Sequence, residues 1–142
     1  MHQVGHPAGR LVTFRVVPPV DDANADAAAA ALRATFAAIP GPVIICSDVS
    51  GARTFSERTV EQFLALMKSE NPRIERSAFL LDPAAATFAL QLERMVREAK
   101  SPIRRTFRDA RALTEWLLPL LTPQEAAALE AFLLMANARS GP

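Results

Sequence analysis

The sequence predicts an α/β fold: a small, mostly parallel sheet of four or five strands covered by helices. Short apolar runs alternate with longer segments in which apolar residues recur every three to four positions, as strands and amphipathic helices do. The chain has 142 residues, about the size of one domain. Half of the residues are hydrophobic and 22% are charged, which is typical of ordered globular proteins. We therefore expect one domain over 1–142.

Two strands and the helix between them are predicted in the first third of the chain. Residues 11–17 are rich in β-branched and aromatic side chains and stop at Pro18 and Pro19, so they predict a strand. An alanine-rich helix should follow, with acidic residues at its start and Pro40 after its end. Residues 43–46 form an uninterrupted apolar run, which favours a strand buried on both faces.

A turn over 47–51 should lead into the next helix. Thr54 and Glu57 have the spacing of a capping box, and Ser56 is a competing cap. The helix that follows carries an apolar stripe formed by Val60, Phe63, Leu64 and Met67. A third strand is expected over 74–81, because its end is continuously apolar.

The last third should hold three helices and one strand. Asp82 and Pro83 are typical of a helix start, and that helix should reach about Lys100. Residues 103–107 predict a short strand near a sheet edge, where its arginine side chains would stay in water. Another helix should begin at Asp109. An additional C-terminal helix is expected over about 122–138, with a capping box at its start formed by Thr122 and Glu125.

Charge and composition exclude several function classes. The formal net charge is +1, so no overall field favours nucleic acid. The apolar runs are far too short to span a bilayer, and residues 1–7 lack the pattern of a signal peptide. Cys46 is the single cysteine, which fits a reducing compartment. Arginine and alanine are abundant, as in proteins from GC-rich bacterial genomes. We expect a cytoplasmic, bacterial protein.

The order of features in the second half resembles a known family. It comprises the apolar strand Ser-Ala-Phe-Leu-Leu-Asp at 77–82, a long helix, a short strand ending in Arg-Thr-Phe at 105–107, and Asp109-Ala110 leading into Glu-Trp-Leu at 115–117. This order resembles the SpoIIAA-like branch of the STAS family, and the turn at 48–51 resembles the one after that family's central strand. The match covers most of 10–118. It implies the STAS fold far more firmly than a task.

The resemblance also implies a possible regulatory site. In the family's anti-sigma antagonists, phosphorylation of a serine near the start of the following helix switches partner binding. Here Glu57 or Arg58 stands at that place, with Ser56 beside it. The chain departs from the family in Pro18 and Pro19, where relatives have a glycine-containing turn, and in the helix after Thr122.

No catalytic, metal or cofactor site is predicted. Cys46 lies inside an apolar strand, so we expect a small buried core residue rather than a nucleophile. His2 and His6 lie in an N-terminal arm without helix signals, which we expect to be mobile, so their spacing does not predict a metal site. The glycines form no phosphate-binding motif, so no nucleotide is expected.

The candidate interaction or regulatory surface follows the central strand. Its residues are Asp48, Ser50, Thr54, Ser56 and Glu57, at the carboxyl end of a strand where open α/β sheets place ligand sites. Ordinary capping and turn formation also explain these residues. The arginines at 104, 105, 108 and 111 form a basic cluster, which predicts a solvated sheet edge more than a docking site.

The C-terminal helix carries more apolar side chains than one face needs. Leu129, Phe132 and Leu133 are therefore either a second core layer or the interface to a partner or a second copy. Our hypothesis is a non-catalytic STAS-like regulatory or protein-interaction module, with the C-terminal helices contributing to dimerisation. The alternative is a small apolar-ligand or lipid-binding protein, which the lipid-carrier likeness of this branch implies. An enzyme using Asp48 and Ser50 is a third possibility.

Overall fold

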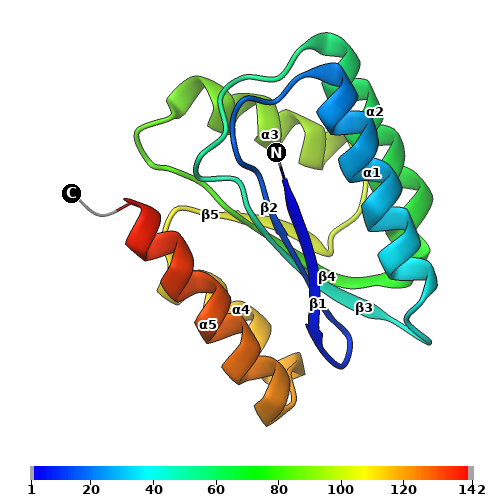
Figure 1. Ribbon diagram of the computed structural model, residues 1–142, viewed down its shortest axis with the longest axis vertical. Coiled ribbons are helices and arrows are strands. Elements are labelled where there is room, and N and C mark those ends of the chain that lie inside the picture. The colour runs from blue at the N-terminus through cyan, green and yellow to red at the C-terminus, as the bar shows by residue number, and fades with distance from the viewer. Residues whose placement is uncertain (1, 141–142) are drawn as a thin grey trace.

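A mixed five-stranded sheet lies between two layers of helices in the computed structural model (Figure 1), which describes residues 2–140 and, within α5, the side chains as far as residue 136. The strand order follows the chain. The strands are β1 (Gln3–Ala8), β2 (Leu11–Arg15), β3 (Val43–Asp48), β4 (Ile74–Leu80) and β5 (Arg104–Phe107). Strand β1 is antiparallel to β2, and all other neighbouring strands are parallel.

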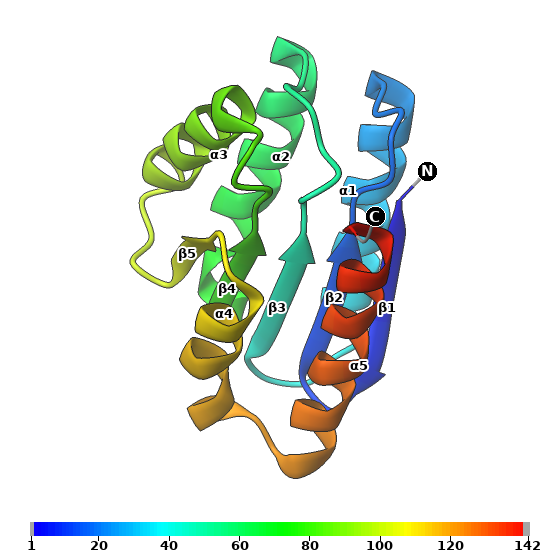
Figure 2. The ribbon, with the colours of Figure 1, turned by 90° about the vertical axis from the view of Figure 1, so that its left-hand side faces the viewer.

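The order of the strands explains where the helices lie. Each parallel connection advances by one strand in the same direction, and crossovers of one hand then place their helices on one face. That face is covered by α1 (Asp22–Ala37), α2 (Glu57–Glu70) and α3 (Ala86–Glu98). The opposite face is covered by α4 (Ala110–Leu117) and α5 (Pro123–Ser140), which Figure 2 shows side by side in front of the sheet. Two short 3-10 turns are η1 (Asn71–Arg73) and η2 (Leu118–Leu120).

Each face of the sheet has its own apolar core. Under α1 to α3, inward residues of the strands such as Val12, Ile45 and Phe79 pack against the helices. Under α4 and α5, the alternate residues of the same strands, including Leu11, Ile44 and Leu80, form the second core. Both faces of β3 are therefore buried, which explains the uninterrupted apolar run at 43–46.

The predicted α/β class with a mostly parallel sheet is confirmed, and each of the four expected strands forms at its predicted place. Strand β5 lies at the sheet edge, as expected. Within the described residues, no helix combines the length and the apolar character needed to cross a bilayer.

The expectation of a mobile N-terminal arm is wrong, because residues 3–8 form β1. This strand pairs with β2 through a tight turn in which Gly9 has a φ of +50°, a value that glycine adopts at little cost. The sequence of β1 contains Gly5 and Pro7 and shows no alternation. Its structure comes from pairing with β2, which a local pattern does not reveal.

The arginines of β5 do not all lie in water. Arg104 points into the core under α2, and its guanidinium donates to the Met67 carbonyl (3.0 Å), to Oγ of Ser77 (3.1 Å) and to Oδ1 of Asn71 (3.2 Å). Burial lowers the pKa of Arg104 to about 10, although the charge of Glu70 opposes this shift. The prediction that this side chain stays solvated is wrong, because three acceptors stabilise it inside the protein.

Helix starts follow the predicted chemistry with small shifts. Ser56, not Thr54, caps α2 by accepting the Thr59 amide at 3.1 Å. Asp82 accepts the Ala84 amide in a turn, and α3 begins only at Ala86.

The capping box before α5 is confirmed. Glu125 accepts the Thr122 amide at 2.8 Å, and its own amide donates to the Thr122 hydroxyl at 3.2 Å. The same carboxylate accepts the Arg10 amide at 2.7 Å, so it also fixes the start of α5 to the β1–β2 turn.

Candidate functional site

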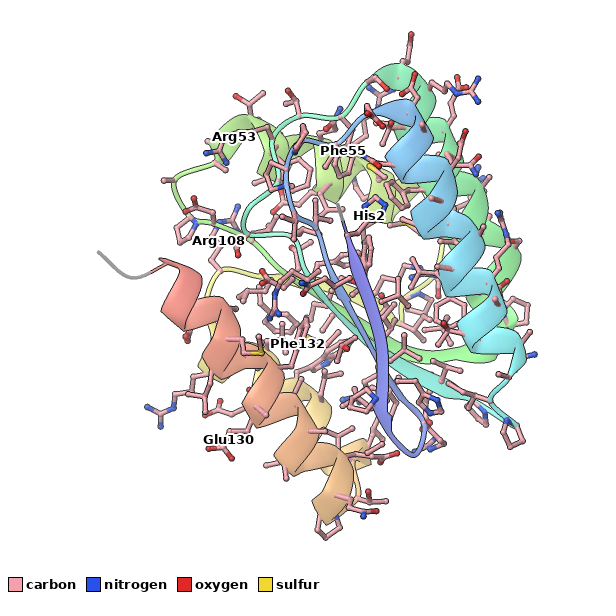
Figure 3. All side chains as sticks on the ribbon, viewed as in Figure 1. His2, Arg53, Phe55, Arg108, Glu130 and Phe132 are labelled. Atoms are coloured by element: carbon pink, nitrogen blue, oxygen red, sulfur yellow. The ribbon has the colours of Figure 1, made fainter. Side chains whose placement is uncertain are left out.

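A cleft of about 820 Å³ opens at the carboxyl ends of the parallel strands. Its walls come from the loop after β3, the start of α4 and the end of α5, near Ala136. Figure 3 labels Arg53 and Arg108, two of its lining residues, which lie near each other at the edge of the molecule. The strand order contains no reversal between parallel strands, so this cleft depends on α4 and α5 to form its walls.

The floor of the cleft is a buried ion pair between β2 and β3. Arg15 and Asp48 are opposite each other in the parallel register, and Nε of Arg15 donates to Oδ2 of Asp48 at 2.9 Å. Both side chains are almost fully buried, with exposed fractions of 3% and 4%. Arg15 also donates to the Phe132 carbonyl of α5 at 2.7 Å and lies over the Phe132 ring at 4.1 Å from its centroid. The ion pair therefore fixes α5 to the sheet.

Ser50 donates two hydrogen bonds to the other carboxylate oxygen of Asp48, Oδ1. Its amide donates to Oδ1 at 3.1 Å, and its hydroxyl donates to the same oxygen at 2.5 Å. Both carboxylate oxygens are thus held, one by a guanidinium and one by a turn.

The rim of the cleft carries charges of both signs. Arg108 pairs with Glu93 at 3.2 Å and Arg111 with Glu115 at 3.3 Å, both partners lying outside the cleft. Arg53 is exposed, and its described hydrogen bond is a weak one to the Ala52 carbonyl at 3.4 Å. Asp82 and Asp109 lie on the same rim. A ligand here would meet exposed guanidinium groups beside carboxylates.

The other predicted surface residues lie apart from the cleft lining. Ser56 donates to Oδ1 of Asp22 at 2.6 Å, and the Thr59 hydroxyl donates to the same oxygen at 2.9 Å. These two bonds, that from Ser56 first, hold the pKa of Asp22 below its ordinary value. The cluster joins α1 to the start of α2. Glu57 and Thr54 are exposed, and Thr54 lines a second, smaller groove that shares Arg53 and Asp82 with the cleft.

No known protein-family model matches this chain. Comparison with curated proteins and with solved structures gives no match either. The geometry of the cleft and of its surroundings therefore carries the functional argument.

The remaining candidate residues lie away from the cleft lining. Cys46 is buried in the core under α4 and α5, and burial raises the pKa of its thiol. Burial also lowers the pKa of His2, which packs near the Phe14 ring, while His6 is exposed and contacts the Gly9 carbonyl. Among the described residues, no group of three or more His, Cys, Asp or Glu could hold a metal ion.

The basic cluster is divided by the fold. Arg104 is buried, whereas Arg108 and Arg111 line the cleft. Arg105 lies on the α4 side of β5, with its guanidinium near the ring of Trp116. The four arginines therefore do not form one docking surface.

The predicted interface residues of α5 face inward. Leu129 and Leu133 are buried in the second core, and the half-buried Phe132 packs against it. These side chains cover the sheet of their own chain.

Arg15 is the site residue that sequence reasoning missed. In Leu-Val-Thr-Phe-Arg it stands at the end of an ordinary strand, so its own segment gives no sign of a special role. The signal lies in the pairing of two strands. Because β2 and β3 both end in a charged residue, of opposite sign, the parallel register brings Arg15 and Asp48 together.

Proposed function

We propose that this chain is a non-catalytic, STAS-like interaction module that binds a protein partner at the cleft and at the adjoining loop after β3. The observation that carries the proposal is an open cleft with a lining of mixed polarity, in which the carboxylate of Asp48 is held by the buried ion pair with Arg15 and by the hydroxyl of Ser50. The shape and charge of the cleft suit the binding of a partner, whereas the side chains of Arg15, Asp48 and Ser50 bond to one another and hold the fold together. The resemblance of residues 48–51 and 74–117 to the SpoIIAA-like branch supports the same function.

A segment of the partner that carries an acidic side chain fits the cleft best. Arg53 is exposed beside it and has no carboxylate partner among the described ion pairs, so it offers a bidentate guanidinium to such a group. Asp82 and Asp109 on the rim would disfavour a ligand that is acidic throughout. The partner segment should therefore be mixed in charge, with one acidic residue near Arg53.

The alternative, an apolar-ligand or lipid carrier, has less room in this structure. An apolar space between the sheet and α1 to α3 has a volume of about 60 Å³. Binding sites for small molecules usually have about 300–1,000 Å³. A lipid would therefore require α1 to α3 to move away from the sheet, which would expose much of the first core.

A photo-crosslinking amino acid at Thr54 tests the partner site directly. We expect a specific adduct with one protein from the source cytoplasm, and none from the same group at Ala31 on the outer side of α1. Once the partner is purified, Arg53→Glu should weaken binding by about tenfold or more, because one charge pair becomes a repulsion. Arg97→Glu, at an exposed position on α3, is the matched control and should bind normally.

Two results would reject the proposal. Equal crosslinking from Thr54 and Ala31, or unchanged affinity of the Arg53→Glu variant, would show that the partner binds elsewhere. Native mass spectrometry of freshly purified protein tests the alternative, since a persistent added mass of lipid size would favour a ligand carrier.

A further inference from the structure

Strand β5 is the outermost strand on its side of the sheet, and only its other side is paired, with β4 (Figure 2). The carbonyls of Ile103 and Phe107 accept amides of the segment 77–81 at 2.9 and 2.8 Å. In a parallel ladder, alternate residues direct both backbone groups to the same neighbour, so the amides and carbonyls of Arg104 and Thr106 point away from β4. No hydrogen bond between described residues uses these four groups.

A groove of about 570 Å³ lies beside the start of β5, on the α4 face of the sheet. Trp116 of α4 lines this groove together with Arg76 of β4 and Arg105 of β5. The guanidinium groups of Arg76 and Arg105 lie 4.7 and 5.6 Å from the centroid of the Trp116 ring, and Arg76 also donates to the Trp116 carbonyl. The aromatic ring therefore holds two positive charges at the groove.

These two charges are not neutralised by the chain itself. Neither Arg76 nor Arg105 has a carboxylate partner among the described ion pairs. The one carboxylate among the described lining residues belongs to Glu75, and it pairs with Arg10. Arg105 is also exposed. Because guanidinium groups bind carboxylates through two parallel hydrogen bonds, the groove favours a ligand with an acidic side chain.

We infer that β5 binds an extended acidic segment of a partner protein, which adds a sixth strand to the sheet. The backbone of this segment bonds to the free groups of Arg104 and Thr106. An acidic side chain opposite Arg105 then lies on the α4 face, where it meets the guanidinium groups of the groove. The groove shares no lining residue with the cleft, so this inference and the proposed function can fail independently.

A second copy of β5 is a poor occupant of this edge. In the antiparallel register in which Arg104 and Thr106 of both copies form hydrogen bonds, the two Arg105 side chains stand directly opposite each other. Like charges at such positions destabilise a strand pair, and charged side chains on edge strands prevent self-pairing. The same residue attracts a carboxylate, so Arg105 selects an acidic segment over a copy of its own strand.

Two capped peptides test this inference with the full-length chain. The first is acetyl-Val-Thr-Glu-Thr-Val-amide, and the second has lysine in place of glutamate. In NMR titrations, we expect the glutamate peptide at millimolar concentration to shift the backbone amide signals of Arg104 and Thr106. It should bind about fivefold or more tightly than the lysine peptide, because its carboxylate meets two guanidinium groups. Thr106→Pro should abolish the shifts, since an edge strand tolerates proline where the amide faces solvent.

Charge reversal provides a second, independent variant. Arg105→Glu should reverse the preference, so that the lysine peptide binds more tightly. Arg97→Glu is the matched control, because Arg97 is exposed on α3 and lies outside the groove lining, and this variant should bind like the native chain. Circular dichroism checks that each variant folds. No shifts at millimolar peptide, equal binding of the two peptides, or shifts confined to another surface would overturn the inference. Self-association that Thr106→Pro abolishes would also overturn it, in favour of a second copy on this edge.

Discussion

Replacing Asp48 with alanine would leave the guanidinium of Arg15 charged, buried and without its counter-ion. Arginine does not lose its proton at ordinary pH, so the charge cannot disappear as it would from a buried lysine. The remaining acceptor of Arg15 is the Phe132 carbonyl, which is neutral. The turn at Ser50 would lose its acceptor as well. Asp48→Ala therefore combines two losses at the floor of the cleft.

The structure allows the size of this effect to be judged. Removing one partner of a buried ion pair costs about 3–5 kcal/mol. The whole free energy of unfolding of a domain is about 5–15 kcal/mol, so the variant should retain only part of its stability. A loss of this size corresponds to a fall in Tm of roughly 10 °C for a chain of this length.

Urea unfolding followed by circular dichroism at pH 7 measures the change. The matched control is Asp26→Ala, which breaks the exposed pair between Asp26 and Arg58 (3.2 Å) and should cost less than about 1 kcal/mol. In the double variant, Asp48→Ala with Arg15→Met, the buried charge is gone and a large part of the loss should be recovered. If Asp48→Ala were no more costly than Asp26→Ala, the buried ion pair would not hold α5 to the sheet.

Three further predictions concern the attachments of the helices. Gly9→Ala should lower the free energy of unfolding, measured in urea, by about 2 kcal/mol or more, because the residue has a φ of +50° and its new methyl group would collide with the carboxylate of Glu125. The control is Gly41→Ala, which also has a positive φ but open space around it and should therefore cost less. Equal losses of stability in the two variants would refute the collision. Burial alone would raise the pKa of Glu125, but hydrogen bonds from the Thr122 and Arg10 amides and the Thr122 hydroxyl, together with the charge of Arg10, outweigh this effect. The pKa of Glu125 in the folded protein is therefore lower than its ordinary value of 4.5. The stability that this carboxylate contributes is therefore present above pH 4.5 and lost as the pH falls through the folded value; unfolding curves of the native chain and of Glu125→Gln should differ at pH 7 and converge at low pH, and a constant difference would contradict this. Ser56→Ala should cost about 1 kcal/mol through the lost cap, and Ser56→Glu should cost more because a second carboxylate then faces Asp22; thermal unfolding checks both, and a more stable Glu variant would refute the repulsion.

Much of the fold could be predicted because local sequence and tertiary packing agree. The apolar run at 43–46 forms a central strand, and the box at Thr122 starts α5. Strand β1 could not be predicted, since its ladder is supplied by β2 and not by its own residues. Arg104 points inward because Met67, Ser77 and Asn71 supply hydrogen-bond acceptors there. These residues are distant from Arg104 in the sequence and come near it only in the folded protein, so the local pattern of β5 does not reveal them.

The site was predicted less completely than the fold. Asp48 and Ser50 were found because they follow the central strand, where parallel sheets expose their ends. Their partner Arg15 belongs to another strand, and its role follows from register and from the covering helix. The residues from Asp48 to Glu57 do not form one surface as predicted, because Ser56 belongs to the contact between α1 and α2.

The placement of α1, α2 and α3 on one side also sets the order in which the molecule can mature on the ribosome. Once β5 has left the ribosome the sheet can form, but Leu11, Ile44 and Leu80 face water on its second side until α4 and α5, which follow β5 in the chain, dock there. That apolar surface is a natural target for a chaperone until the last two helices emerge. Arg15 can donate to the Phe132 carbonyl only after α5 has docked, so this hydrogen bond joins the first residues of the sheet to the last helix of the chain.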